Sequence, residues 1–147
     1  MPLQILHQDI TTIECDIIVN PTDSCYSGGG GTDAAIHRAA GKELAEACRK
    51  LPPLPQGTVV PTPAFRLPAK TILHTFGPVW KNGKQNEAVI LRSCYVNALI
   101  EAGRLGAESI AFPLISSGTF RFPKDKVLKI ATDAISDFLL TSDREIL

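Results

Sequence analysis

The sequence has little that would suit a membrane span, a secretion signal or a nucleic-acid surface. No apolar run approaches the roughly 20 residues that cross a bilayer. The N-terminal segment lacks the basic region and the long apolar region of a signal peptide. Lys and Arg number 15, and so do Asp and Glu, which gives a formal net charge of zero. We therefore expect no membrane partner and no nucleic-acid partner, because nucleic acid needs a basic face.

Cysteine and histidine are too scattered to indicate a metal site or a disulfide framework. The four cysteines are widely spaced without a C-x-x-C pair, and there are only three histidines. We expect free thiols in a reducing compartment, a cytoplasmic location, and neither a bound metal nor a cofactor.

The sequence does have the composition of an ordinary globular domain. Hydrophobic residues make up 44% of the 147 residues and charged residues 20%. A chain of this length can form one domain with a substantial core. We see no internal repeat and no long linker, so we expect a single domain over residues 1–147.

Hydrophobic periodicity predicts strands that alternate with helices. Strands are expected at residues 3–7, 16–19, 57–62 (stopped by Pro61 and Pro63), 70–76 and, as a buried strand, 109–112. Apolar spacings of three and four predict helices at residues 32–50, 87–105 and 123–141, and residues 144–147 resemble the beginning of a further strand. This order predicts an α/β fold whose mixed, largely parallel central sheet is covered by helices on both faces.

Residues 17–37 contain the strongest local signal for a ligand. A short apolar strand leads to four glycines, Gly28 to Gly31, and a helix opens at Thr32. A helix N-terminus offers unpaired N–H groups, and glycines let the backbone approach an anion. Asp23 and Asp33 flank the loop. The pattern favours a phosphate-bearing ligand over a flexible loop without a ligand, although neither a full dinucleotide fingerprint nor a Walker A loop is present.

A second loop of small residues follows the strand at residues 109–112. Ser116 and Ser117 lack the nucleophile-elbow pattern, so we interpret them as donors to phosphate. Phe120 and Phe122 are each candidates for the core or for a ring that stacks on a sugar or base. Because both loops follow strands, we expect them at the same edge of the sheet, holding a diphosphate from two sides.

Three other polar residues have simpler interpretations. Asp9, taken alone, is best interpreted as a carboxylate that caps a turn. His37 and His74 have apolar neighbours in the sequence, which favours structural histidines over catalytic ones.

Five segments, in order, resemble the macro domain, a family that binds ADP-ribose. They are DIT at residues 9–11, IVNPTD at 18–23 (family "IVNAAN"), GGGTDAAIHRAAG at 29–41 ("GGGVDGAIHRAAG"), LHTFGP at 73–78 ("IHTVGP") and SIAFPLISSG at 109–118 ("SIAFPAISTG"). The resemblance covers nearly the whole chain and is strongest to the MacroD-type hydrolase branch. It implies a three-layer α/β/α fold.

The resemblance also implies roles for individual residues. Asp9 would accept a hydrogen bond from the adenine amino group, with the backbone N–H of Ile10 beside it. Asp33 would position or activate a water, with Asp23 and Asn20 orienting the ribose. The residues along the diphosphate and distal ribose would be Gly29, Gly30, Gly31, Ser116, Ser117, Gly118, Thr119 and Phe120.

Three features depart from the family pattern. Asp23 replaces the second Asn of "NAAN". An ionised Asp only accepts hydrogen bonds, whereas Asn can also donate one to a ribose hydroxyl. Arg121 stands where Gly is common. The family's last strand helps to hold the adenine pocket, and the sequence ends where that strand would begin. We therefore expect a domain that lacks most of its C-terminal strand.

These features leave three functional hypotheses. The first is a metal-independent hydrolase of ADP-ribose esters, which are either mono-ADP-ribosylated acidic side chains or O-acetyl-ADP-ribose. The second is a non-catalytic module that reads ADP-ribose, which the Asp23 replacement favours. The third is a macro-like domain that has lost the nucleotide. The expected partners are ADP-ribose or an ADP-ribosylated protein, bound by a monomer.

Overall fold

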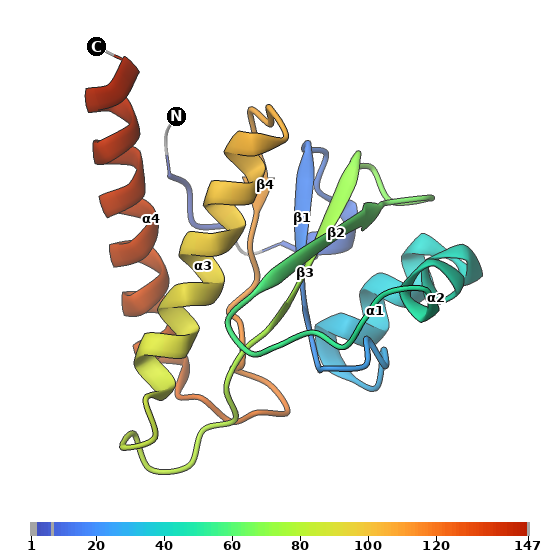
Figure 1. Cartoon of the computed structure of the whole chain (residues 1–147), viewed down its shortest axis with the longest axis horizontal. Helices are drawn as coiled ribbons and strands as arrows, with labels where there is room; N and C mark the ends of the chain where they lie inside the picture. The colour runs from blue at the N-terminus through green and yellow to red at the C-terminus, as the bar shows by residue number, and fades with distance from the viewer. Residues whose placement is uncertain (1–2, 7, 147) are drawn as a thin grey trace.

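The computed structural model describes residues 3–6 and 8–146, and a four-stranded sheet lies at its centre (Figure 1). The strands are β1 (Ile17–Thr22), β2 (Val59–Pro63), β3 (Thr71–Phe76) and β4 (Ile110–Ala111), in the order β2-β3-β1-β4. β1 pairs in parallel with both β3 and β4, whereas β2 pairs antiparallel with β3. The predicted mixed, largely parallel sheet is confirmed.

Helices cover both faces of this sheet, so the predicted three-layer architecture is also confirmed (Figure 1). They are α1 (Gly31–Ala40) and α2 (Lys42–Arg49) on one face, and α3 (Glu87–Arg104) and α4 (Lys124–Ile146) on the other. A 3₁₀ turn, η1 (Ile10–Thr12), precedes β1.

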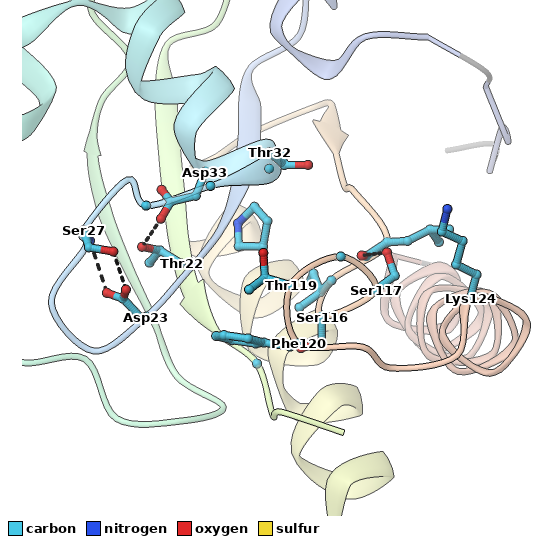
Figure 2. Close-up of a pocket in the computed structure, with 18 residues that line it drawn as sticks. Thr22, Asp23, Ser27, Thr32, Asp33, Ser116, Ser117, Thr119, Phe120 and Lys124 are labelled. Atoms are coloured by element: carbon cyan, nitrogen blue, oxygen red, sulfur yellow. Dashed lines mark hydrogen bonds between the residues drawn. The ribbon is translucent and has the colours of Figure 1, made fainter. Parts of the chain in front are cut away.

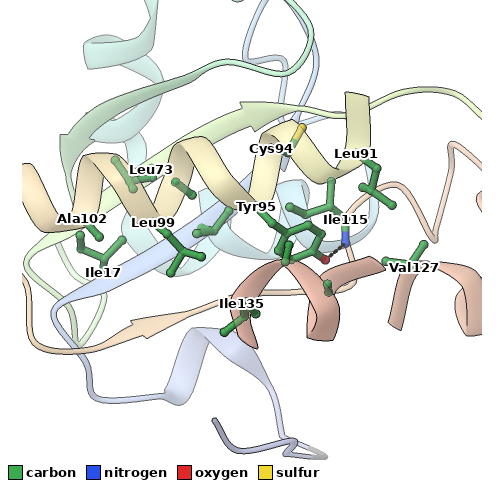
Figure 3. Packing of buried hydrophobic residues seen from close by; sticks show 14 of the residues in the cluster. Ile17, Leu73, Leu91, Cys94, Tyr95, Leu99, Ala102, Ile115, Val127 and Ile135 are labelled. Carbon is green, nitrogen blue, oxygen red and sulfur yellow. Dashed lines mark hydrogen bonds between the residues drawn. The ribbon is translucent and has the colours of Figure 1, made fainter. Parts of the chain in front are cut away.

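Apolar side chains of β1 point alternately to the two faces of the sheet, so helices have to bury both faces. Ile17 and Val19 join the cluster with α3 and α4, and Ile18 joins the cluster with α1 and α2. All three side chains are almost fully buried. Figure 3 shows the first cluster, where Tyr95 of α3 reaches between the sheet and α4. Each fully buried aliphatic side chain stabilises the fold by about 1.5–3 kcal/mol.

Two predicted helix and strand boundaries need correction near the N-terminus. Residues 3–6 form no strand, and Ile5 is 71% exposed; His7, at the end of that predicted strand, lies outside the described residues. The helix predicted over residues 32–50 is two helices, because Gly41 adopts a φ of 96° that no helix contains.

Three further predictions about strands are wrong. β2 continues through Pro61 to Pro63, because an edge strand tolerates proline where the N–H would point away from its partner. β4 is only half-buried and two residues long. Residues 144–146 continue α4 and do not begin a strand; Leu147 lies outside the described residues.

No helix within the described part of the chain is both long and apolar enough to cross a membrane.

Candidate functional site

A cavity of about 460 Å³ lies at the carboxyl end of β1, between the two loops singled out in the sequence (Figure 2). One wall is the segment from Pro21 to Asp33, and the other is the loop from Leu114 to Phe120. The structure brings together ten of the predicted site residues as its lining: Asp23, Gly29, Gly30, Gly31, Asp33, Ser116, Ser117, Gly118, Thr119 and Phe120.

The glycine loop delivers the N-terminus of α1 to this cavity. The helix begins at Gly31, and its first N–H groups have no partner within the helix. Gly28 and Gly31 have φ values of 67° and 56°, which other residues rarely adopt. A Cβ on Gly28 would also lie 3.1 Å from the His37 ring. Gly28 and Gly31 are therefore required by the path of the backbone, and the loop presents backbone donors to an anion.

Asp33 holds this loop in place. Its Oδ2 accepts from the Thr22 hydroxyl at 2.8 Å and from the Gly28 N–H at 3.0 Å. Its Oδ1 accepts from Asn20 Nδ2 at 2.9 Å and lies 3.4 Å from His37 Nε2. The side chain is buried, and its two oxygens accept three hydrogen bonds. The carboxylate is thus bound to the strand, the loop and its own helix while it lines the cavity.

Asp23 is turned toward its own loop. Its Oδ1 accepts from the N–H groups of Cys25 (2.9 Å) and Ser27 (3.1 Å), and its Oδ2 accepts from the Ser27 hydroxyl (Figure 2). Partial burial raises the pKa of Asp23, but the donors from Ser27 and Cys25 outweigh burial, so the pKa is lowered overall. Asp23 therefore remains a negative charge at the cavity wall.

Asn20 lies behind the cavity wall and is not part of its lining. It is fully buried, and its Nδ2 lies 2.9 Å from Asp33 Oδ1 and 3.0 Å from His74 Nδ1. The structure therefore brings it together with Asp33, whereas Asp23 is part of the lining and Asn20 is not.

The second loop is anchored by the core. The Tyr95 hydroxyl donates to the Pro113 carbonyl at 2.8 Å. It also accepts from the Ile115 N–H at 3.0 Å (Figure 3). Ser116 follows with a φ of 67° and a buried Oγ that has no partner among the described residues. An unpartnered hydroxyl facing a cavity is available to a ligand.

The two phenylalanines of this loop divide between the two interpretations. Phe120 lines the cavity and packs against Phe76, with ring centroids 6.1 Å apart. Phe122 belongs to the core and packs on Trp80 at 4.8 Å. Arg121 is exposed, is not part of the cavity lining, and has a φ of 63°, which explains why glycine suits this position.

A second cavity, of about 870 Å³, adjoins the first. Thr32 and Leu114 line both, so the two cavities meet at these residues and are together called the elongated cleft. The second cavity contains the other two predicted ligand residues, Asp9 and Ile10. Asp9 Oδ1 accepts from the N–H (2.9 Å) and hydroxyl (2.8 Å) of Thr11, which lowers the pKa of Asp9. The capping role is confirmed, and the side chain also lines the cavity.

Sequence reasoning missed several residues of the site. Thr22, Ser27, Thr32 and Lys124 line the first cavity. Lys124 could have been found, because it is the first residue of a helix that directly follows the second loop. Thr22 and Ser27 act through contacts with Asp33 and Asp23, and nothing in the sequence pattern reports those contacts.

Metal-binding geometry does not occur in the described part of the chain, where no three His, Cys, Asp or Glu residues converge. All four cysteines are free.

The profile of the Macro domain family matches residues 19–131, which is more than half of the chain. The chain belongs to the macro domain family. A macro domain-containing protein of Ralstonia nicotianae is 48% identical over 135 residues, which are 92% of this chain and 79% of that protein. An O-acetyl-ADP-ribose deacetylase of Citrobacter rodentium is 47% identical over 141 residues, which are 93% of this chain and 80% of that protein.

Solved macro domains share the fold. The Oceanobacillus iheyensis macrodomain with ADP superposes with a TM-score of 0.87 at 39% identity, covering 90% of this chain and 73% of that chain. The Trypanosoma brucei macrodomain in complex with ADP gives a TM-score of 0.84 at 34% identity, covering 90% of this chain and 55% of that chain.

Proposed function

We propose that this macro domain binds ADP-ribose along the elongated cleft and hydrolyses an ester on its distal ribose. The substrates would be O-acetyl-ADP-ribose or a protein that carries ADP-ribose on an acidic side chain. The observation that carries the proposal is the pair of cavities that meet at Thr32 and Leu114. One end has the Asp9 carboxylate, and the other has the glycine loop facing the loop of Ser116. Several relatives with 43–47% identity are named O-acetyl-ADP-ribose deacetylase.

The chemistry of the walls suits the parts of this ligand. The adenine amino group would donate a hydrogen bond to Asp9. The diphosphate would lie between the N-terminus of α1 and the second loop. Lys124, which lines the same cavity, adds a positive charge. Phe120 offers an apolar ring to the distal ribose.

Asp33 is proposed as the residue that positions the attacking water at the distal ribose. A carboxylate that lines the cavity and accepts three hydrogen bonds has a fixed orientation, which is what positioning a nucleophile requires. Asn20 would contribute by orienting Asp33, and Asp23 by fixing the loop before the glycines.

A non-catalytic reader is the second candidate, and one observation favours it. Asp23 has both oxygens engaged by its own loop and offers no donor to a ribose hydroxyl. A site could then bind ADP-ribose without orienting it for hydrolysis. In either case we propose a cytoplasmic monomer. The four free thiols support a reducing compartment.

Acetate release from O-acetyl-ADP-ribose tests the proposal. The wild type is expected to turn over, and Asp33→Asn to be slower by about 100-fold, since misplacing a positioned reactant costs that order of rate. Asp137→Asn on the exposed face of α4 is the matched control and should match the wild type. Tight ADP-ribose binding without any acetate release would instead establish the reader.

A further inference from the structure

We propose that His74 is a positioning residue of this site, which holds the Asn20 amide so that Asn20 presents a donor to Asp33. This inference rests on the proposed function and deepens it. His74 lies on β3 and is not among the residues that line either cavity. Its effect would reach the glycine loop through two buried side chains.

A continuous chain of polar contacts leads from the edge of the sheet to the glycine loop. The hydroxyl oxygen of Thr62, on β2, lies 2.8 Å from His74 Nε2. His74 Nδ1 lies 3.0 Å from Asn20 Nδ2 on β1, where residues 20 and 74 are register partners. Asn20 then donates to Asp33 on α1, and Asp33 accepts from the Gly28 N–H. Every side chain in this series of contacts is buried.

The chemistry of the groups fixes the direction of each contact. The Asp33 carboxylate only accepts, so the amide nitrogen of Asn20 has to face it. The same nitrogen faces His74 Nδ1, so Nδ1 has to accept and carries no proton. The ring proton is then on Nε2 and is donated to Thr62 Oγ1. His74 is therefore neutral, in one defined tautomer.

Both amide hydrogens of Asn20 are used by this arrangement, while its Oδ1 has no partner among the described residues. A rotated amide would turn Oδ1 toward Asp33 and place two acceptors against each other. An apolar residue at position 74 would remove the acceptor that opposes this rotation. Asp33 would then lose one of its donors, and the glycine loop would lose part of its support.

A matched pair of variants separates this role from simple packing. In His74→Asn, the side-chain oxygen is as many bonds from Cα as His Nδ1 and can accept from Asn20. His74→Leu has nearly the same volume but no acceptor, and both variants lose the Thr62 contact. We expect kcat of the Leu variant to fall about tenfold or more and that of the Asn variant to stay within about threefold of the wild type.

Ile72→Val is the control for packing, because Ile72 is fully buried on the same strand. It should lower the melting temperature while kcat stays unchanged. Equal kcat values for the Leu and Asn variants would overturn the inference, since the acceptor that the inference requires is kept by Asn and lost in Leu, although Leu fills the space of the ring better. A wild type that neither binds ADP-ribose nor releases acetate would instead overturn the proposed function.

The imidazole nitrogens give a readout that packing does not move. ¹⁵N NMR of the wild type should show a protonated Nε2 and an unprotonated Nδ1 for His74 at neutral pH. A protonated Nδ1 would contradict the positioning role, because it could not accept from Asn20.

Discussion

The side chain of Ser116 occupies the space beside Gly77 in which any other residue would carry its Cβ. A Cβ at position 77 would overlap Ser116 Oγ and lie 2.8 Å from Ile115 Cγ2. Gly77→Ala should therefore displace the second loop and weaken ADP-ribose binding by about tenfold or more, as calorimetry would measure. Gly103→Ala, in α3 with no atom within 4 Å of the new Cβ, is the control and should keep wild-type affinity. Equal affinities for the two variants would refute the loop contact.

Removal of the Asp23 charge should improve the site. Asn at this position keeps an oxygen for the Cys25 and Ser27 N–H groups, gains a donor, and removes a negative charge near the diphosphate. We expect Asp23→Asn to bind ADP-ribose about 3- to 10-fold more tightly at low salt and to turn over faster. The gain should shrink as salt rises.

Asp133→Asn removes the same charge from an exposed position on α4 and serves as the comparison for Asp23→Asn. A gain of similar size there, or no gain in Asp23→Asn, would show that the local charge at the cavity is not limiting.

Glu87 fixes the loop before α3. Its two oxygens accept from the N–H groups of Lys81, Asn82, Gly83 and Gln85, at 2.6–3.1 Å. Burial raises the pKa of Glu87, but these backbone donors outweigh burial and lower it to about 2. Glu87→Gln replaces one acceptor oxygen by an amide, so the melting temperature at pH 7 should fall by several degrees.

The pH dependence of that loss is a separate check. A lowered folded-state pKa stabilises the fold above the ordinary value of 4.5, and this contribution is lost as pH falls toward 2. The difference between wild type and Glu87→Gln should thus narrow below pH 4.5. Glu101→Gln, which breaks an exposed pair with Arg104, should change little at any pH.

His74 should make the wild type sensitive to moderate acid. Burial, together with the nearby His37, lowers the pKa of His74 from 6.5 to about 3. Between these values the unfolded chain binds the proton and the folded chain does not, so stability falls as pH drops from 6.5 toward 3. By pH 4.5 this costs about 2–3 kcal/mol. Urea unfolding of His74→Asn should show a smaller loss between pH 7 and 4.5, and parallel curves would contradict the assignment.

Much of this fold could be predicted from the sequence, because local patterns and burial agree in it. Ile17 to Val19 are apolar at successive positions, and the strand is indeed buried on both faces. The helix from Glu87 to Arg104 follows its apolar spacing closely. Prediction failed where the backbone departs from regular structure. A positive φ at Gly41 divides one amphipathic pattern into two helices, and periodicity alone does not report φ.

The candidate site was likewise only partly predictable from the sequence. Loops that offer glycines and serines could be recognised in the sequence, because backbone access and hydroxyl donors are properties of residue types. The contacts behind them could not, since they join residues far apart in the chain. His74 and Asn20 are 54 positions apart, and only the register of β3 on β1 places their side chains together.

Calorimetric titration of the wild type with ADP-ribose, with AMP as the comparison, tests the central claim most directly. If the two cavities form one working cleft, ADP-ribose should bind with a Kd in the micromolar range, and AMP should bind far more weakly. In the proposed binding mode, AMP would reach only the adenine end and leave the glycine loop empty. Equal affinities, or no binding of ADP-ribose by the folded protein, would contradict the account.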